Sequence, residues 1–98
     1  MKKIHLTLKA QQKIVADHEK VLDKDDPFLA LSYSELSGIY QDMGNFLLAL
    51  EYQQKALAIR EKVLDKDAPE LAVSYNNLAS IYHCMGSFSL ALEYQQKT

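Results

Sequence analysis

Hydrophobic residues recur every three or four positions in several separate segments of the 98-residue chain. Such spacing places side chains on one face of an α-helix. Between residues 27 and 43 the recurring positions are Leu29, Ser32, Tyr33, Leu36, Ile39, Tyr40 and Met43. Asp26 and Pro27 are typical of a helix start, and Gly44 is typical of a helix end. The pattern therefore predicts a helix over 27–43 with one buried stripe.

A second helix is predicted directly after this glycine. Asn45 is a favourable capping residue, and apolar positions recur from Phe46 to Leu64. The short turn makes the two helices antiparallel neighbours. The octet LALEYQQK opens the second helix. Within the octet we expect Leu48, Ala49, Leu50 and Tyr52 to pack against neighbouring helices. We expect Gln53, Gln54 and Lys55 mostly to face water.

The same two-helix pattern returns 42 residues later. Residues 61–97 match residues 19–55 at 26 of 37 positions, and Ser87 stands where Asn45 caps the earlier copy. A weaker copy of the octet, LTLKAQQK, occupies residues 6–13. We therefore predict one all-α domain over 1–98 with about five helices. It consists of an unpaired second-type helix (4–22), a full helix pair (27–64) and a second pair with a truncated last helix (69–98).

The repeated residues resemble the tetratricopeptide repeat (TPR) over nearly the whole chain. The motif reads Tyr33-x-x-Leu36-Ser37-x-x-Tyr40 followed by Gly44, Phe46, Ala49 and Ala56, and Tyr75-x-x-Leu78-Ala79-x-x-Tyr82 follows it one period later. The 42-residue period is similar to the longer repeats of kinesin light chain and nephrocystin-type proteins. Tyrosine replaces the family's usual tryptophan, and serine or alanine replaces its glycine. The resemblance implies a right-handed superhelix of helix pairs, with the first helix of each pair lining a concave groove.

The two copies of the first helix differ mostly on one face. Drift of an exposed surface and selection for binding both explain such variation, although the expected water-facing residues Gln53, Gln54 and Lys55 did not drift. In the family such grooves hold extended peptides, so the resemblance makes this face the candidate binding site. Its members are Ser34, Glu35, Gly38, Gln41, Asp42, Asn76, Asn77, Ser80 and His83. Asn76 and Asn77 are the strongest candidates, because an amide donates to and accepts from a peptide backbone.

Charge restricts the partner that this face could bind. Segments 27–43 and 69–85 contain no lysine or arginine, whereas Glu35 and Asp42 are acidic. A clamp for a terminal carboxylate is therefore absent, and a neutral to mildly basic peptide is expected. The net charge of -2 argues against nucleic acid as a partner.

Other chemistry has little support in the sequence. His5, His18 and His83 share no metal-ligand spacing, and His83 and Cys84 point about 100° apart on a helix. We expect no enzyme, no catalytic residue, no metal and no cofactor. No apolar run approaches the ~20 residues that span a bilayer, and the start is too polar for a signal peptide. A single cysteine fits a reducing compartment, so we expect a cytoplasmic protein without a membrane partner.

The two ends of the repeat carry apolar residues without an evident cover. The front segment carries Ile4, Leu8, Ile14 and Val15, and the short last helix carries Leu90, Ala91 and Tyr94. We expect the chain to be part of a longer array or an engineered excerpt. Two functions stay open. One is an adaptor that binds an extended peptide, and the other is a self-assembly module that stacks or swaps through its ends into a homo-oligomer.

Overall fold

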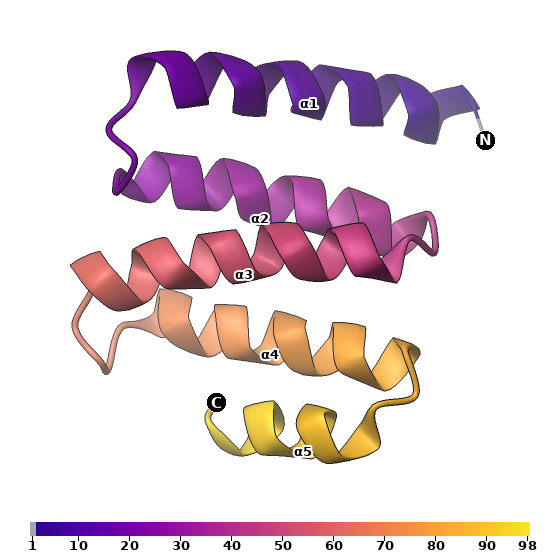
Figure 1. Cartoon of the computed structure of the whole chain (residues 1–98), viewed down its shortest axis with the longest axis vertical. Coiled ribbons are helices and arrows are strands. Elements are labelled where there is room, and N and C mark those ends of the chain that lie inside the picture. The colour runs from indigo at the N-terminus through magenta and orange to yellow at the C-terminus, as the bar shows by residue number, and fades with distance from the viewer. Residues whose placement is uncertain (1) are drawn as a thin grey trace.

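The computed structural model describes residues 2–98, and their side chains from Leu6 onward, as a stack of α-helices. Five helices make up this part of the chain: α1 (Lys2–Val21), α2 (Pro27–Asp42), α3 (Phe46–Val63), α4 (Pro69–Cys84) and α5 (Phe88–Gln96). Successive helices are antiparallel neighbours in sequence order (Figure 1). The all-α fold with TPR-like helix pairs is confirmed. The side chains of Ile4 and His5 lie outside the described residues.

The helix ends follow the expected chemistry in the first repeat more closely than in the second. Asp26 Oδ1 accepts from the Phe28 amide at 2.8 Å, and Asn45 Oδ1 accepts from the Leu48 amide at 3.3 Å. The expected cap by Ser87 is wrong, because its side chain makes no capping hydrogen bond. Gly44 and Gly86 both have φ of +81°, the left-handed conformation that closes a helix cheaply only at glycine.

The buried side chains form two clusters that follow the repeat. The larger cluster joins α1, α2 and α3, with Ile81 of α4 at its edge, and includes Val15, Leu36 and Ala49. The smaller cluster joins α3 to α4 through Leu57 and Leu78. Each helix thus buries one stripe against its sequence neighbours, as a solenoid requires, because no single helix pair can cover both of its own faces.

The joints between repeats also contain buried polar contacts. His18 on α1 bonds the Ser32 hydroxyl on α2, and 42 residues later Arg60 Nη1 donates to Ser74 Oγ at 2.7 Å. Removal of the Arg60 guanidinium from water lowers its pKa. In both joints, therefore, a side-chain nitrogen of the preceding helix bonds the hydroxyl of the serine at the same position of the repeat.

Three residues that were expected to face water take part in packing to different degrees. Gln53 is 1% exposed, so the expectation is wrong for this residue. Gln54 and Lys55 are exposed, yet both make contacts. Lys55 Nζ lies 5.5 Å from the ring centroid of Tyr33 and 5.1 Å from that of Tyr52, and Gln54 Nε2 donates to a tyrosine hydroxyl on α4 at 3.4 Å. Because these contacts give the residues a packing role in the first copy, their identity is weak evidence that the variable face was selected for binding.

Candidate functional site

The nine candidate residues form what we call the first-helix face, on α2 and α4. The structure brings part of it together across the repeat boundary. Gln41 Nε2 on α2 donates to Ser80 Oγ on α4 at 2.8 Å and lies 3.9 Å from Cys84 Sγ. This hydrogen bond joins α2 to α4. It also uses part of the hydrogen-bonding capacity that Gln41 and Ser80 could offer to a ligand.

Other members of the first-helix face differ in how free they are. Ser34 Oγ donates to Gln53 Oε1 at 3.3 Å and so takes part in the scaffold. Glu35 and Asp42 are exposed acids. Gly38 is exposed in the middle of α2, and a Cβ added there would meet no atom within 4 Å. Packing therefore gives no reason for glycine at this position, although glycine weakens a helix interior.

Asn76 and Asn77 both keep an unused amide. Within the described part of the chain, neither side chain has a hydrogen-bond partner. Asn76 is exposed and Asn77 is half-buried. Each amide can donate and accept, so both are available to a backbone laid along α4.

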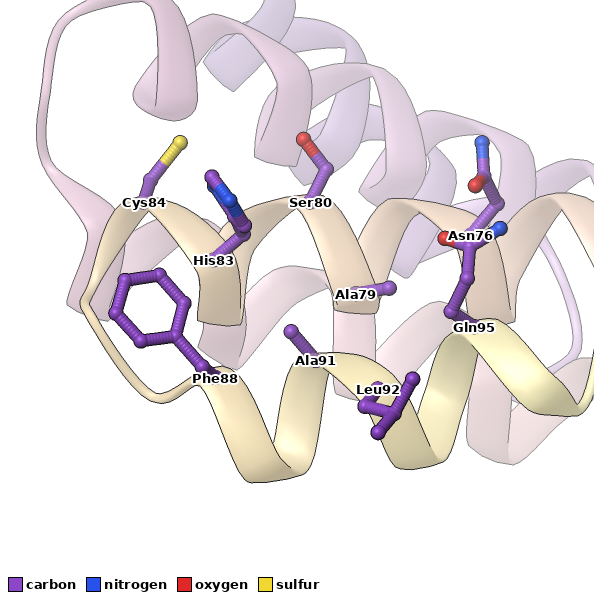
Figure 2. A pocket seen from close by; sticks show the side chains of 9 residues that line it. All are labelled: Asn76, Ala79, Ser80, His83, Cys84, Phe88, Ala91, Leu92 and Gln95. Carbon is purple, nitrogen blue, oxygen red and sulfur yellow. The ribbon is translucent and has the colours of Figure 1, made fainter.

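A hollow of about 380 Å³ lies between α4 and α5, and we call it the terminal groove (Figure 2). The lining comes from both helices: Asn76, Ala79, Ser80, His83, Cys84, Phe88, Ala91, Leu92 and Gln95. Three of these belong to the predicted site, and sequence reasoning missed the four from α5. The His83 ring meets the Phe88 ring edge to face, with centroids 5.2 Å apart. The groove is mainly apolar with a few polar groups along α4.

The signal that could have revealed the groove was the repeat itself. Phe88 and Leu92 stand one period after Phe46 and Leu50, which the following helix half-buries. No helix follows α5 within these residues, so its matching side chains remain uncovered. Of the first-helix face, Asn77 and the α2 residues lie outside the terminal groove.

The described residues hold no group of three or more His, Cys, Asp or Glu side chains placed to bind a metal ion. Among those same residues, no helix is long and apolar enough to cross a membrane. Neither α2 nor α4 contains a lysine or arginine.

The comparison with known proteins agrees with this geometry. The profile of the tetratricopeptide repeat matches residues 28–98. The chain belongs to the tetratricopeptide repeat family. TPR domains are generally protein–protein interaction modules and are typically non-catalytic.

Solved structures add a more specific likeness. The TPR-like repeats of a kinesin-light-chain-type protein of Podosopora anserina, which are nearly identical to one another, superpose with a TM-score of 0.90 at 26% identity. A second structure, of a variant of the same protein, gives the same values. The match covers 96% of this chain and 44% of that chain, so this chain spans less than half of its relative. Among curated proteins, a search found no match.

Proposed function

We propose that this TPR domain is an adaptor that binds an extended peptide segment of a partner protein along the first-helix face. The observation that carries the proposal is the pair of unused amides at Asn76 and Asn77. Each amide can donate to and accept from a peptide backbone without reading its side chains, and the two amides approach it from different sides because neighbours on a helix point about 100° apart. This mode of binding suits an adaptor, since it holds the backbone and leaves specificity to the surrounding residues.

Gly38 supports the proposal from α2. Its missing side chain has no packing role, yet it leaves an open strip of helix next to Gln41. A peptide backbone could approach α2 closely only where no side chain stands. The acids Glu35 and Asp42, with no lysine or arginine on either first helix, favour a neutral to mildly basic segment.

A selection from random twelve-residue peptides on the immobilised 98-residue protein tests this proposal. We expect enriched peptides of neutral to weakly positive charge, and an affinity loss of about tenfold or more for the double variant Asn76→Ala, Asn77→Ala. Ser89→Ala, an exposed change on α5, is the matched control and should leave the affinity unchanged. Equal binding by the wild type and the double variant would refute the proposal.

Gly38→Ala separates function from stability. Alanine should raise the free energy of unfolding by about 0.5–1 kcal/mol, because it favours the helix and meets no neighbour. The same change should weaken binding of the selected peptide if the backbone passes over this position. A variant that is more stable and binds equally well would place the peptide elsewhere.

A further inference from the structure

We propose that the segment bound on the first-helix face carries an aliphatic residue and, two positions from it, a lysine or arginine. The aliphatic side chain lies between Leu31 of α2 and Val73 of α4, which we call the aliphatic subsite, and the cation pairs with Glu35. This inference rests on the proposed function and names the chemistry of its ligand. It uses only the strip between α2 and α4, and each of these helices has a neighbouring helix on both sides.

Two side-chain contacts fix the register of α2 against α4. Gln41 Nε2 donates to Ser80 Oγ at 2.8 Å and lies 3.9 Å from Cys84 Sγ, so Gln41 stands level with the turn between them. Figure 2 shows Ser80 and Cys84 pointing away from α5. Both first helices run in the same direction, because each is antiparallel to α3 (Figure 1). The same register places Leu31 level with Val73 to within one residue, about three turns nearer the helix starts.

The two residues of the aliphatic subsite are exposed although they are apolar. Leu31 is 45% exposed and Val73 is 50% exposed. They stand at the same position of the repeat, so the residue differs between the copies while its aliphatic character does not. Helix preference does not explain the valine, because a β-branched residue is less favourable than leucine in a helix. A ligand side chain covered by both residues would explain it.

Beyond the aliphatic subsite the strip is open to a peptide backbone. Gly38 lies on its α2 side, where an added Cβ would meet no atom within 4 Å. Asn77 lies on its α4 side, one turn beyond the subsite, and its amide has no hydrogen-bond partner among the described residues. The amide is thus placed to bond the backbone next to the aliphatic residue. The bond between Gln41 and Ser80 closes the strip at its other end.

The charge beside the aliphatic subsite favours a cation. Glu35 is exposed, lies one turn from Leu31 and has no ion pair within the described part of the chain. Neither α2 nor α4 contains a lysine or arginine, so no fixed positive charge on them opposes an incoming cation. Four helical residues rise by about 6 Å, which two residues of an extended chain also span. Because alternate residues of an extended chain point to the same side, an aliphatic residue and a cation two positions apart fit Leu31 and Glu35 together.

Parallel selections from random twelve-residue peptides on the whole 98-residue protein and its variants test the inference. On the wild type we expect an aliphatic residue and a lysine or arginine two positions apart, in either order, to be enriched about tenfold or more. Glu35→Lys should replace the cation by an acid and keep the aliphatic residue, whereas Val73→Ser should lose the aliphatic residue and keep the cation. Glu93→Lys, the same charge change at an exposed site on α5, is the matched control and should give the wild-type profile.

Titration of a wild-type-selected peptide by fluorescence anisotropy gives a second measurement. Glu35→Lys should weaken its binding about tenfold and Val73→Ser about fivefold. Added salt should weaken binding to the wild type and should affect Glu35→Gln less, because salt screens an exposed ion pair but not the burial of aliphatic surface.

The inference and the proposed function can fail separately. Enriched peptides that depend on Asn76 and Asn77 but lack the aliphatic and basic pair would overturn the inference alone. The same holds if the pair is enriched equally on the wild type, Glu35→Lys and Val73→Ser. A library in which nothing is enriched on the wild type would overturn both.

Discussion

The helix pairs α2–α3 and α4–α5 share most of their residues but differ in what surrounds them. In the first pair, α3 has 18 residues and is covered by α2 on one side and α4 on the other. In the second pair, α5 has 9 residues and packs mainly against α4. Gln53 is consequently buried and Gln95 exposed, although each occupies the same place in the repeat. Residue identity in a solenoid therefore does not determine environment, because half of each helix's cover comes from the next repeat.

The shorter α5 also changes the aromatic packing. Tyr40 stacks on Tyr52 with centroids 5.8 Å apart, and Tyr82 stacks on Tyr94 at 5.6 Å, so the ring geometry is repeated. The surroundings are not repeated, because α5 ends before the positions that match Ala56. As a result Tyr40 is 7% exposed while Tyr82 is only half-buried.

Truncation of the matched core leucines should give the largest difference between the two pairs. Leu36→Ala is expected to lower the free energy of unfolding by about 4 kcal/mol and Leu78→Ala by about 2.5 kcal/mol. Both side chains are almost fully buried, but Leu36 belongs to the larger cluster, whose more numerous buried neighbours leave less room for collapse around a cavity. Urea unfolding followed by circular dichroism measures both values. A larger loss for Leu78→Ala would show that the second pair is packed as tightly as the first.

A smaller difference is expected at the repeated glutamine. Gln53 Nε2 is buried without a hydrogen-bond partner in the described part of the chain, so Gln53→Met should raise the free energy of unfolding by about 1 kcal/mol. Gln95→Met is the matched control and should change it by less than about 0.5 kcal/mol, because that amide reaches water. Thermal melting of the two variants compares them directly. Destabilisation by Gln53→Met would mean that the bond from Ser34 outweighs the unpaired amide.

Most of the fold could be predicted from the sequence, because helix periodicity, the glycines at 44 and 86 and the 42-residue repeat all depend on local residues. The environment of each copy could not, since it depends on what lies beside it. Gln53 is polar and was therefore expected to be exposed, yet it is 1% exposed and accepts from Ser34 on α2. The terminal groove was missed for the reverse reason, because Leu92 and Phe88 resemble core residues until the structure shows that no helix covers them.

The smallest expected difference is a pH dependence at the matched tyrosines of the two first helices. Tyr33 donates to Glu19 at 2.7 Å, and burial first and this carboxylate second raise the pKa of Tyr33 to about 12. Tyr75 donates to Glu61 at 2.9 Å, and the same causes raise its pKa as well. A raised pKa of an acid means that the folded state favours the neutral phenol. The contribution of the neutral phenol to the free energy of unfolding is therefore complete below about pH 10. It is lost between pH 10 and 12, because the unfolded chain ionises first.

Urea unfolding from pH 8.5 to 11 should show the free energy of unfolding falling less steeply in Tyr33→Phe than in the wild type, and Tyr75→Phe should lie between them. If Tyr75→Phe reduced the fall of the free energy of unfolding with pH more than Tyr33→Phe does, the expected order of the two tyrosines would be wrong.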